Sequence, residues 1–243
     1  MDSNNELIQK INEKYISMGL EPEAFYKGLL YSKPINYWDY IEVESLLSLQ
    51  KPRTDYPDEM VFIMYHQVTE LLLNMMTHEM HQVCNNENLT ADYFIEKLGR
   101  MNRYIQMLAN SFDVMRLGMD PNQYNEFRFS LTPASGFQCA SFRFAEIYST
   151  DIENLLDTRV KGNLPANYDT AFLFENIYWQ AAGKDHKTEK KSYLLNLFEE
   201  KYLDKFIAMA NEYKTKNIWQ KYVAMPEKDK NNPALIQALK DLD

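Results

Sequence analysis

Hydrophobic residues recur at helical spacing through most of the chain, and the clearest run lies between Asp58 and Val83. Within Met60–Met80 the apolar sequence is interrupted by a polar residue at every fourth position, namely His66, Glu70, Asn74 and His78. Residues four apart share one face of a helix, so the pattern predicts a long helix with one polar stripe. We expect the helix to be buried on most of its other sides. We expect Asp58 or the nearby Asp55 to cap its first turn.

The same spacing predicts several further helices, at 3–18, 37–49, about 90–118, 135–156, about 168–182, 192–213 and 233–242. Gly19 is expected to end the first helix, and Thr90 to cap the one after the apolar run. Residues 19–36 are interpreted as an ordered extended arm. Since no repeat or interdomain linker interrupts the pattern, we expect a single all-α helical-bundle domain over 1–243 with long antiparallel helices, in which 1–36 form an N-terminal arm.

Composition supports this class. The chain has only seven glycines and nine prolines among 243 residues, which disfavours a turn-rich β architecture, and its 45% hydrophobic content excludes a disordered chain. A net charge of −9 argues against a nucleic-acid partner or an anionic membrane. The polar N-terminal sequence does not resemble a signal peptide, and no apolar run reaches membrane-spanning length. Cys84 and Cys139 sit in apolar runs, so two thiols and a reducing, cytoplasmic location are expected.

Specific polar groups gather in the stretch YNEFRFSLTPASGFQCASFR, which begins at Tyr124. Tyr124 and Arg128 are four residues apart, so one helical turn would place a phenol and a guanidinium on the same face. Pro133 interrupts the helix, because it lacks an N–H and disfavours α geometry in the residue before it. Ser135 and Gly136 follow with a small hydroxyl and a backbone that a ligand can approach closely. The stretch therefore predicts a binding wall.

The apolar helix carries a second candidate group at His66. A lone histidine in such a helix is most often a satisfied core residue. Here, however, Phe62 lies one turn earlier on the same face, and Glu70 one turn later is placed to fix a tautomer. Arg128 is open to two readings as well, as a structural ion pair with the nearby Glu126 or as a bidentate carboxylate ligand. By themselves these residues predict a pocket for a small aromatic acid.

Other common motifs do not fit. The glycines are too far apart for a nucleotide-binding loop. The run His78–His81 falls short of the zincin motif, because its two histidines are three positions apart and no third ligand is evident. Leu73 and Gln82 stand where a di-iron bundle would need histidines. Cys139 has no histidine nearby in sequence, which disfavours a nucleophilic thiol. No metal site made of protein ligands is predicted.

Three blocks resemble the tryptophan 2,3-dioxygenase family. They are YWDYIEVESLLSLQKP at 37–52, DEMVFIMYHQVTELL at 58–72 and EFRFSLTPASGFQCASFRFAE at 126–146. The blocks stand in the family's order and at roughly its spacing, and the helices between them suit its all-α fold. The likeness covers about 37–157 well and 168–222 more distantly. It is closest to a bacterial branch of the family.

The resemblance implies a role for each matching residue. His66 would be the distal histidine above a haem, facing the indole N–H of the substrate, and Phe62 would pack against the indole ring. Arg128 would hold the substrate carboxylate with help from Tyr124. These assignments follow from the likeness to the family and from nothing in the spacing.

Four more positions are implied in the same way. Tyr37 and Tyr40 look like the tyrosines that a neighbouring subunit contributes to the pocket, which implies a homotetramer. Ser135 and Gly136 would line the cavity for haem and substrate. The expected reaction of this oxidoreductase inserts both atoms of O₂ across the indole C2–C3 bond of L-tryptophan or a related indole, giving N-formylkynurenine in tryptophan catabolism along the kynurenine pathway. The iron of haem b would activate O₂, while the protein supplies orientation and a dry pocket.

One departure from the family is pronounced. The family's proximal haem histidine lies in a C-terminal region with a Gly-Thr-Gly-Gly-Ser-like motif, and neither is found here, since the one histidine after residue 81 is His186 in the polar segment GKDHKTEKK. We therefore expect the C-terminal region to be truncated, the proximal ligand to be missing and haem to bind this chain weakly when it is made alone. Two classes stay open: a haem dioxygenase with an incomplete or variant sequence, and a haem-free member that binds an indole or aromatic amino acid or serves as a non-catalytic assembly subunit.

Overall fold

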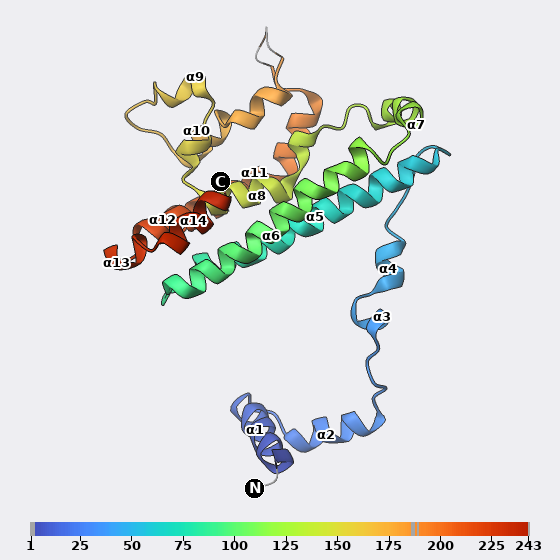
Figure 1. Cartoon of the computed structure of the whole chain (residues 1–243), viewed down its shortest axis with the longest axis vertical. Coiled ribbons are helices and arrows are strands. Elements are labelled where there is room, and N and C mark those ends of the chain that lie inside the picture. Colours follow the sequence, from blue (N-terminus) through green and yellow to red (C-terminus); the bar gives the residue numbers. More distant parts are fainter. Residues whose placement is uncertain (1–2, 186–187, 189, 243) are drawn as a thin grey trace. The chain divides into compact units, whose positions relative to one another are not determined.

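A computed structural model describes residues 3–185, 188 and 190–242. Helices make up the regular structure of these residues apart from two isolated bridges, Leu156 with Ile177 and Lys184 with Lys191, so the predicted all-α fold is confirmed (Figure 1). The chain divides into two compact units, Met1–Gln50 and Lys51–Asp243. The expectation of one domain over 1–243 stays a prediction. No described helix is both long and apolar enough to cross a bilayer.

The first unit consists of four helices, α1 (Ser3–Ser17), α2 (Pro22–Tyr31), α3 (Tyr37–Tyr40) and α4 (Val43–Leu47). Gly19 follows the end of α1 with a left-handed φ of 72°, in agreement with the prediction that it ends the first helix. The expected extended arm is wrong over α2, because Pro22 starts a helix at its first position and Glu23 suits its N-terminal dipole. None of the described residues of this unit is buried.

The predicted helix over 37–49 is two short helices. The Asn36 side chain caps α3 by accepting a hydrogen bond from the Asp39 N–H at 2.9 Å. Glu42 then takes a φ of 53°, a left-handed conformation that no helix can pass through, and α4 begins after it. The one-helix prediction failed because the apolar spacing continues across this break.

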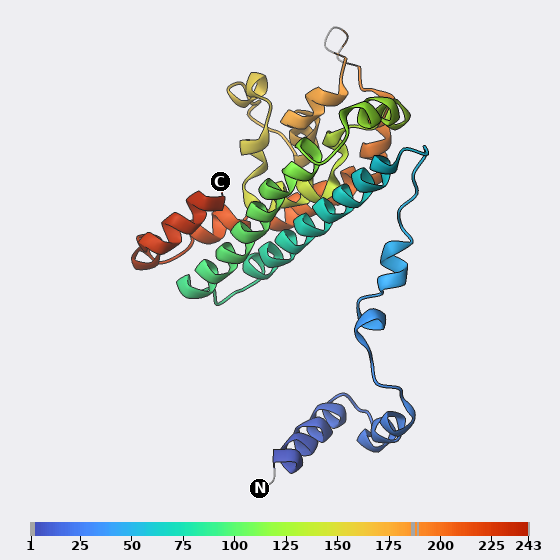
Figure 2. The same ribbon diagram turned by 45° about the vertical axis from the view of Figure 1, so that its right-hand side comes forward.

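The second unit is built on two long antiparallel helices, α5 (Pro57–Cys84) and α6 (Ala91–Arg116), which lie side by side in both ribbon views (Figures 1 and 2). Thr90 caps α6 as predicted, since its hydroxyl accepts from the Tyr93 N–H at 3.3 Å. Between the helices the buried carboxylate of Glu79 accepts from the Lys97 ammonium at 2.6 Å. The hairpin shares one apolar core, which includes Met76, Met80, Val83, Phe94, Leu98 and Met101.

Two expectations for α5 are wrong. Its N-cap is Tyr56 without a side-chain cap, and the carboxylate of Asp58 instead accepts a hydrogen bond from the backbone N–H of Asp120 at 2.7 Å. The helix is also not buried on most sides. Its core face contacts α6 and neighbouring helices, while a second apolar stripe is exposed at Met64, Val68, Leu71 and Met75.

The rest of the unit is a series of short helices around one more long helix, α11 (Tyr193–Tyr213). The predicted helix over 135–156 ends early, because α8 stops at Ser149 and Thr150 is extended. The elements are α7 (Pro121–Phe127), η1 (Arg128–Leu131), η2 (Gly136–Gln138), α8 (Ala140–Ser149), η3 (Ile152–Leu155), α9 (Thr158–Lys161), α10 (Thr170–Glu175), η4 (Tyr178–Gly183), α12 (Ile218–Val223), α13 (Glu227–Lys230) and α14 (Pro233–Leu242).

A second apolar cluster joins α8, α10, η4 and α11. It is rich in aromatic residues, including Phe137, Phe174, Trp179, Phe198 and Phe206. The packing is tight where η4 meets α11, since a Cβ on Gly183 would lie 2.9 Å from the Cβ of Leu195. The Ser135–Gly136 turn consists of Ser135 and the short helix η2 that follows it. The cluster fixes the position of this turn, because Phe137 of η2 belongs to the cluster.

Candidate functional site

The structure brings together the four residues of the predicted aromatic-acid site. The rings of Phe62 and His66 on α5 lie 4.1 Å apart between centroids. The ring of Tyr124 on α7 lies 6.3 Å from that of Phe62, and the guanidinium carbon of Arg128 lies 5.7 Å from the Tyr124 centroid. One surface of the second unit therefore carries two aromatic rings, an imidazole and a guanidinium. The roles of these residues stay predictions.

Phe127, which the sequence reasoning missed, holds α7 against α5. It is fully buried and packs edge-on against Phe62 at 5.6 Å and Tyr124 at 5.5 Å. The backbone N–H of Asp58 also donates to the Gln123 side chain at 3.2 Å, next to the bond between the Asp58 carboxylate and the Asp120 N–H. The sequence did contain a signal for this role of Phe127. It stands three residues after Tyr124 and therefore lies next to it on the same helical face.

His66 is exposed, so it is not a buried core histidine. Its Nδ1 lies 2.8 Å from the backbone carbonyl oxygen of Phe62. A carbonyl can only accept, so this contact favours the neutral tautomer with its hydrogen on Nδ1 and leaves Nε2 as an acceptor. The carbonyl of Phe62 thus has the role that sequence reasoning gave to Glu70.

Glu70 contacts Cys139 instead. Burial, together with the hydrogen bond and negative charge of Glu70, raises the pKa of the Cys139 thiol to about 11. Burial also raises the pKa of Cys84 to about 12. Both cysteines carry free thiols, and neither has the lowered pKa of a nucleophile. The contact links the face of α5 that carries His66 to the end of the Ser135–Gly136 turn.

The remaining predicted site residues are exposed. Ser135 is the N-cap of η2 and its backbone N–H donates to the Gln138 side chain at 3.0 Å, while Gly136 is the first residue of η2. Tyr37 and Tyr40 lie on α3 of the first unit and are 72% and 74% exposed. The structure describes that unit by itself, so the predicted contribution of these tyrosines to a pocket stays a prediction.

Phe62 and His66 offer an aromatic ring and an imidazole on one surface, the residue types that one face of a haem would require. The other described histidines, His78 and His81, are also on α5, about 18 and 22 Å further along its axis at 1.5 Å per residue, so neither can face His66 across a porphyrin. His186 lies outside the described residues. No group of three or more potential metal ligands occurs among the residues that the structure describes.

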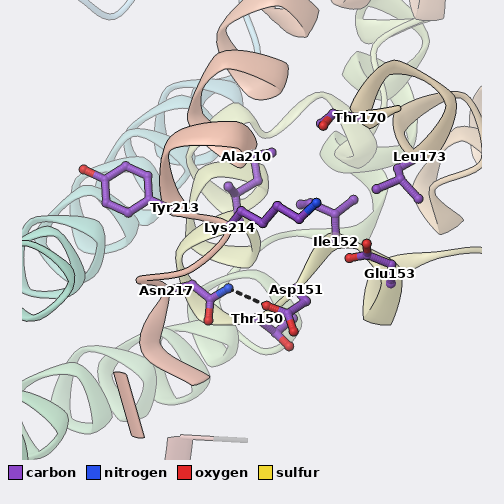
Figure 3. Close-up of a pocket in the computed structure, with 11 residues that line it drawn as sticks. Thr150, Asp151, Ile152, Glu153, Thr170, Leu173, Ala210, Tyr213, Lys214 and Asn217 are labelled. Atoms are coloured by element: carbon purple, nitrogen blue, oxygen red, sulfur yellow. Dashed lines mark hydrogen bonds between the residues drawn. The ribbon is translucent and has the colours of Figure 1, made fainter. Parts of the chain in front are cut away.

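The predicted site does not coincide with the small cavity drawn in Figure 3. That cavity has a volume of about 20 Å³, enough for about one water molecule, and Asn217 donates to Asp151 at its edge at 2.8 Å. A larger groove of about 590 Å³ lies beside α12 and α14, between Trp219 and Leu155. Neither hollow is lined by a histidine or an arginine. Neither offers the chemistry expected for an aromatic amino acid.

Comparison with known proteins relates most of the chain to one family. The family model described as tryptophan 2,3-dioxygenase matches residues 28–234. The tryptophan 2,3-dioxygenase of Bradyrhizobium diazoefficiens is 35% identical over 157 residues, which are 60% of this chain and 55% of that protein. The enzyme of a Ruegeria species is 35% identical over 118 residues, or 48% and 42% of the two chains. That of Bacillus cereus is 31% identical over 156 residues, or 58% and 55%. The chain spans about half the length of these curated relatives.

Proposed function

The chain belongs to the tryptophan 2,3-dioxygenase family, and from this we propose that it takes part in the haem-dependent insertion of O₂ into the indole ring of L-tryptophan, giving N-formylkynurenine. The observation that carries the proposal is the grouping of Phe62, His66, Tyr124 and Arg128 on one surface of the second unit. An aromatic amino acid needs a ring-stacking surface, a carboxylate ligand and an acceptor for the indole N–H, and the group contains all three.

The carboxylate of the substrate would bind Arg128. Its exposed guanidinium presents a planar fork of donors that matches a carboxylate in two parallel hydrogen bonds. Tyr124 lies beneath that guanidinium and restricts its orientation, since a cation is attracted to an aromatic face. Tyr124 therefore assists binding by holding Arg128.

The indole would lie against Phe62 with its N–H directed to His66. Offset stacking on Phe62 buries the ring, and the bare Nε2 of His66 accepts the indole hydrogen. Both side chains are fixed by α5, because they are one turn apart on the same face. The small residues Ser135 and Gly136 would line the cavity that holds substrate and haem.

Haem b supplies O₂ activation at its iron when it is bound. In this proposal the protein works as a cytoplasmic homotetramer, with Tyr37 and Tyr40 of each first unit reaching the pocket of a neighbouring copy. The chain's own residues bind the amino acid, orient its indole and exclude water from it.

A second function is that of a haem-free family member, because Phe62 and Arg128 can hold an aromatic amino acid without a haem. Such a protein would bind an indole or an aromatic amino acid, or serve as a non-catalytic assembly subunit. The recognition groups would be the same, so the two functions differ in haem and product but not in the binding residues.

The two functions are separated by measuring haem, product and binding on the same preparation. The purified chain is mixed with haem and L-tryptophan, and the Soret band and N-formylkynurenine are recorded beside calorimetric titration of tryptophan. Product that is lost in Arg128→Ala but retained in Arg116→Ala supports the dioxygenase. Tryptophan binding without a Soret band or product supports the haem-free member. The absence of both binding and product would reject the dioxygenase and the binding of an aromatic amino acid, and would leave only the assembly subunit.

A further inference from the structure

Arg143 is a buried residue whose hydrogen-bond network is used by neither proposed function. It lies on α8 and is 7% exposed. Its Nη1 donates to Glu146 and to the Tyr178 hydroxyl, at 2.8 Å in both cases. The Tyr178 hydroxyl in turn donates to the second carboxylate oxygen of Glu146 at 2.5 Å. The three side chains thereby join α8 to η4.

Aromatic rings enclose the same guanidinium. Its carbon lies 4.9 Å from the ring centroid of Phe142, 5.6 Å from that of Tyr178 and 5.7 Å from that of Trp179. These separations are those of cation–π contacts. The side chain is therefore fixed in both position and plane.

This network reaches the Ser135–Gly136 turn through packed rings. Trp179 packs edge-on against Phe198 of α11 at 5.6 Å. Phe137, the one buried residue of η2, packs edge-on against the same Phe198 at 5.9 Å. Arg143 and the turn thus contact opposite ends of one short aromatic chain.

A second connection runs along the backbone. The N–H of Arg143 donates to the carbonyl of Cys139 at 3.3 Å, and the N–H of Cys139 donates to the carbonyl of Gly136 at 3.2 Å. The N–H of Gln138 completes the ladder by donating to Ser135 at 3.1 Å. The orientation of the first turn of α8 therefore sets the orientation of the Ser135–Gly136 turn.

Stability does not explain why a guanidinium is used here. Its Nε has no hydrogen-bond partner within the described part of the chain, and an apolar residue of similar volume avoids that desolvation. An apolar side chain would, however, lack the directional bonds to Glu146 and Tyr178. We propose that Arg143 is a positioning residue that holds the Ser135–Gly136 turn in the wall of the aromatic amino-acid site. This inference rests on the proposed function for its link to binding.

Hydrogen exchange tests the positioning without any ligand. In Arg143→Met the backbone amides of Gln138 and Cys139 should exchange about tenfold faster than in the native chain, because the turn opens locally without global unfolding. Lys97→Met is the control for lost stability, since it removes another buried cation with a carboxylate partner far from the turn in sequence and should destabilise the whole unit. In each variant the exchange of the turn amides is therefore measured relative to that of buried amides in α6. An equal relative acceleration of the turn amides in Arg143→Met and Lys97→Met would overturn the proposal. If Arg143→Met does not fold, Tyr178→Phe removes one hydroxyl and is judged against the same control.

Binding tests the link to the site. Tryptophan affinity should fall about tenfold in Arg143→Met and remain near the native value in Lys97→Met. Arg143→Lys should not restore it, because an ammonium lacks the planar fork. Faster exchange with unchanged affinity would overturn the role in the site. A native chain that binds no aromatic amino acid would reject the proposed function, and the exchange comparison would still decide whether Arg143 holds the turn.

Discussion

The Nδ1 of His66 lies 2.8 Å from the backbone carbonyl oxygen of Phe62 one turn earlier on α5. The neutral imidazole should therefore carry its hydrogen on Nδ1 and present Nε2 as an acceptor. Nitrogen NMR of histidine-labelled protein, at a pH where the imidazole is neutral, should show a protonated Nδ1 and an unprotonated Nε2. The signals of the other three histidines, His78, His81 and His186, can be identified by replacing each residue. A hydrogen on Nε2 of His66 would remove its proposed role as acceptor.

Arg128→Lys should weaken the binding of tryptophan. The ammonium keeps the charge but cannot reproduce two parallel hydrogen bonds, so the loss should be about 1.5–3 kcal/mol of binding free energy. Calorimetric titration measures it. Arg116→Lys is the control, because Arg116 is an exposed arginine on α6 paired with Asp113. An unchanged affinity in Arg128→Lys would exclude Arg128 from the site.

Lys97→Met should destabilise the second unit by about 3–5 kcal/mol, because it leaves the buried Glu79 carboxylate without its main partner. Burial alone would raise the pKa of Glu79, but the hydrogen bonds and charges of Lys97 and Arg100 outweigh it and lower that pKa. Urea unfolding gives the change in free energy. The double variant Glu79→Leu with Lys97→Met should recover most of the loss, and a double variant as unstable as the single one would contradict this account.

The stability of the second unit should fall in acid partly through Asp157. Hydrogen bonds from Arg159 lower the pKa of Asp157 from 3.8 to about 2. A carboxylate with a lowered folded-state pKa stabilises the fold fully above its ordinary pKa and loses that contribution as the pH falls to about 2. The free energy of unfolding should decline less steeply over this range in Asp157→Asn than in the native chain. The difference should be small, because the Arg159 side chain is exposed and the pair is screened by solvent.

The first unit should associate with a second copy of the chain. Tyr37 and Tyr40 are largely exposed, and no described residue of that unit is buried. Large aromatic side chains that are exposed next to one another are typical of a protein–protein interface. Sedimentation equilibrium should show an oligomer that dissociates more readily in Tyr37→Ser with Tyr40→Ser than in Tyr193→Ser, a control on α11 that is equally exposed. A native chain that is monomeric at all concentrations would contradict the prediction.

The long helices were predictable because apolar spacing and caps agree over many residues. The limits of α6 and α11 are each within two residues of the predicted ones, and Thr90 caps as expected. The break after α8 was not predictable. Its extended residues are held by Asp151, which accepts hydrogen bonds from Asn217 and Gln220, and these come from a helix far away in the sequence. Local propensity carries no information about such partners.

The candidate site shows the same division. Spacing alone predicted that Phe62 would accompany His66 and that Tyr124 would accompany Arg128, because each pair is separated by one helical turn. The contact between the two pairs depends on how α7 packs on α5, which is decided by Phe127 and by hydrogen bonds of Asp58. No periodicity in the sequence links those positions, so the surface formed by the two pairs could be identified only from the structure.

The lack of burial in the first unit has a calorimetric consequence. The heat capacity change of unfolding arises mainly from apolar surface that becomes hydrated. A unit in which no described residue is buried would add little to that change in a separate chain. Its contribution would appear only when chains associate, as a negative heat capacity of binding, and the melting temperature would then rise with protein concentration.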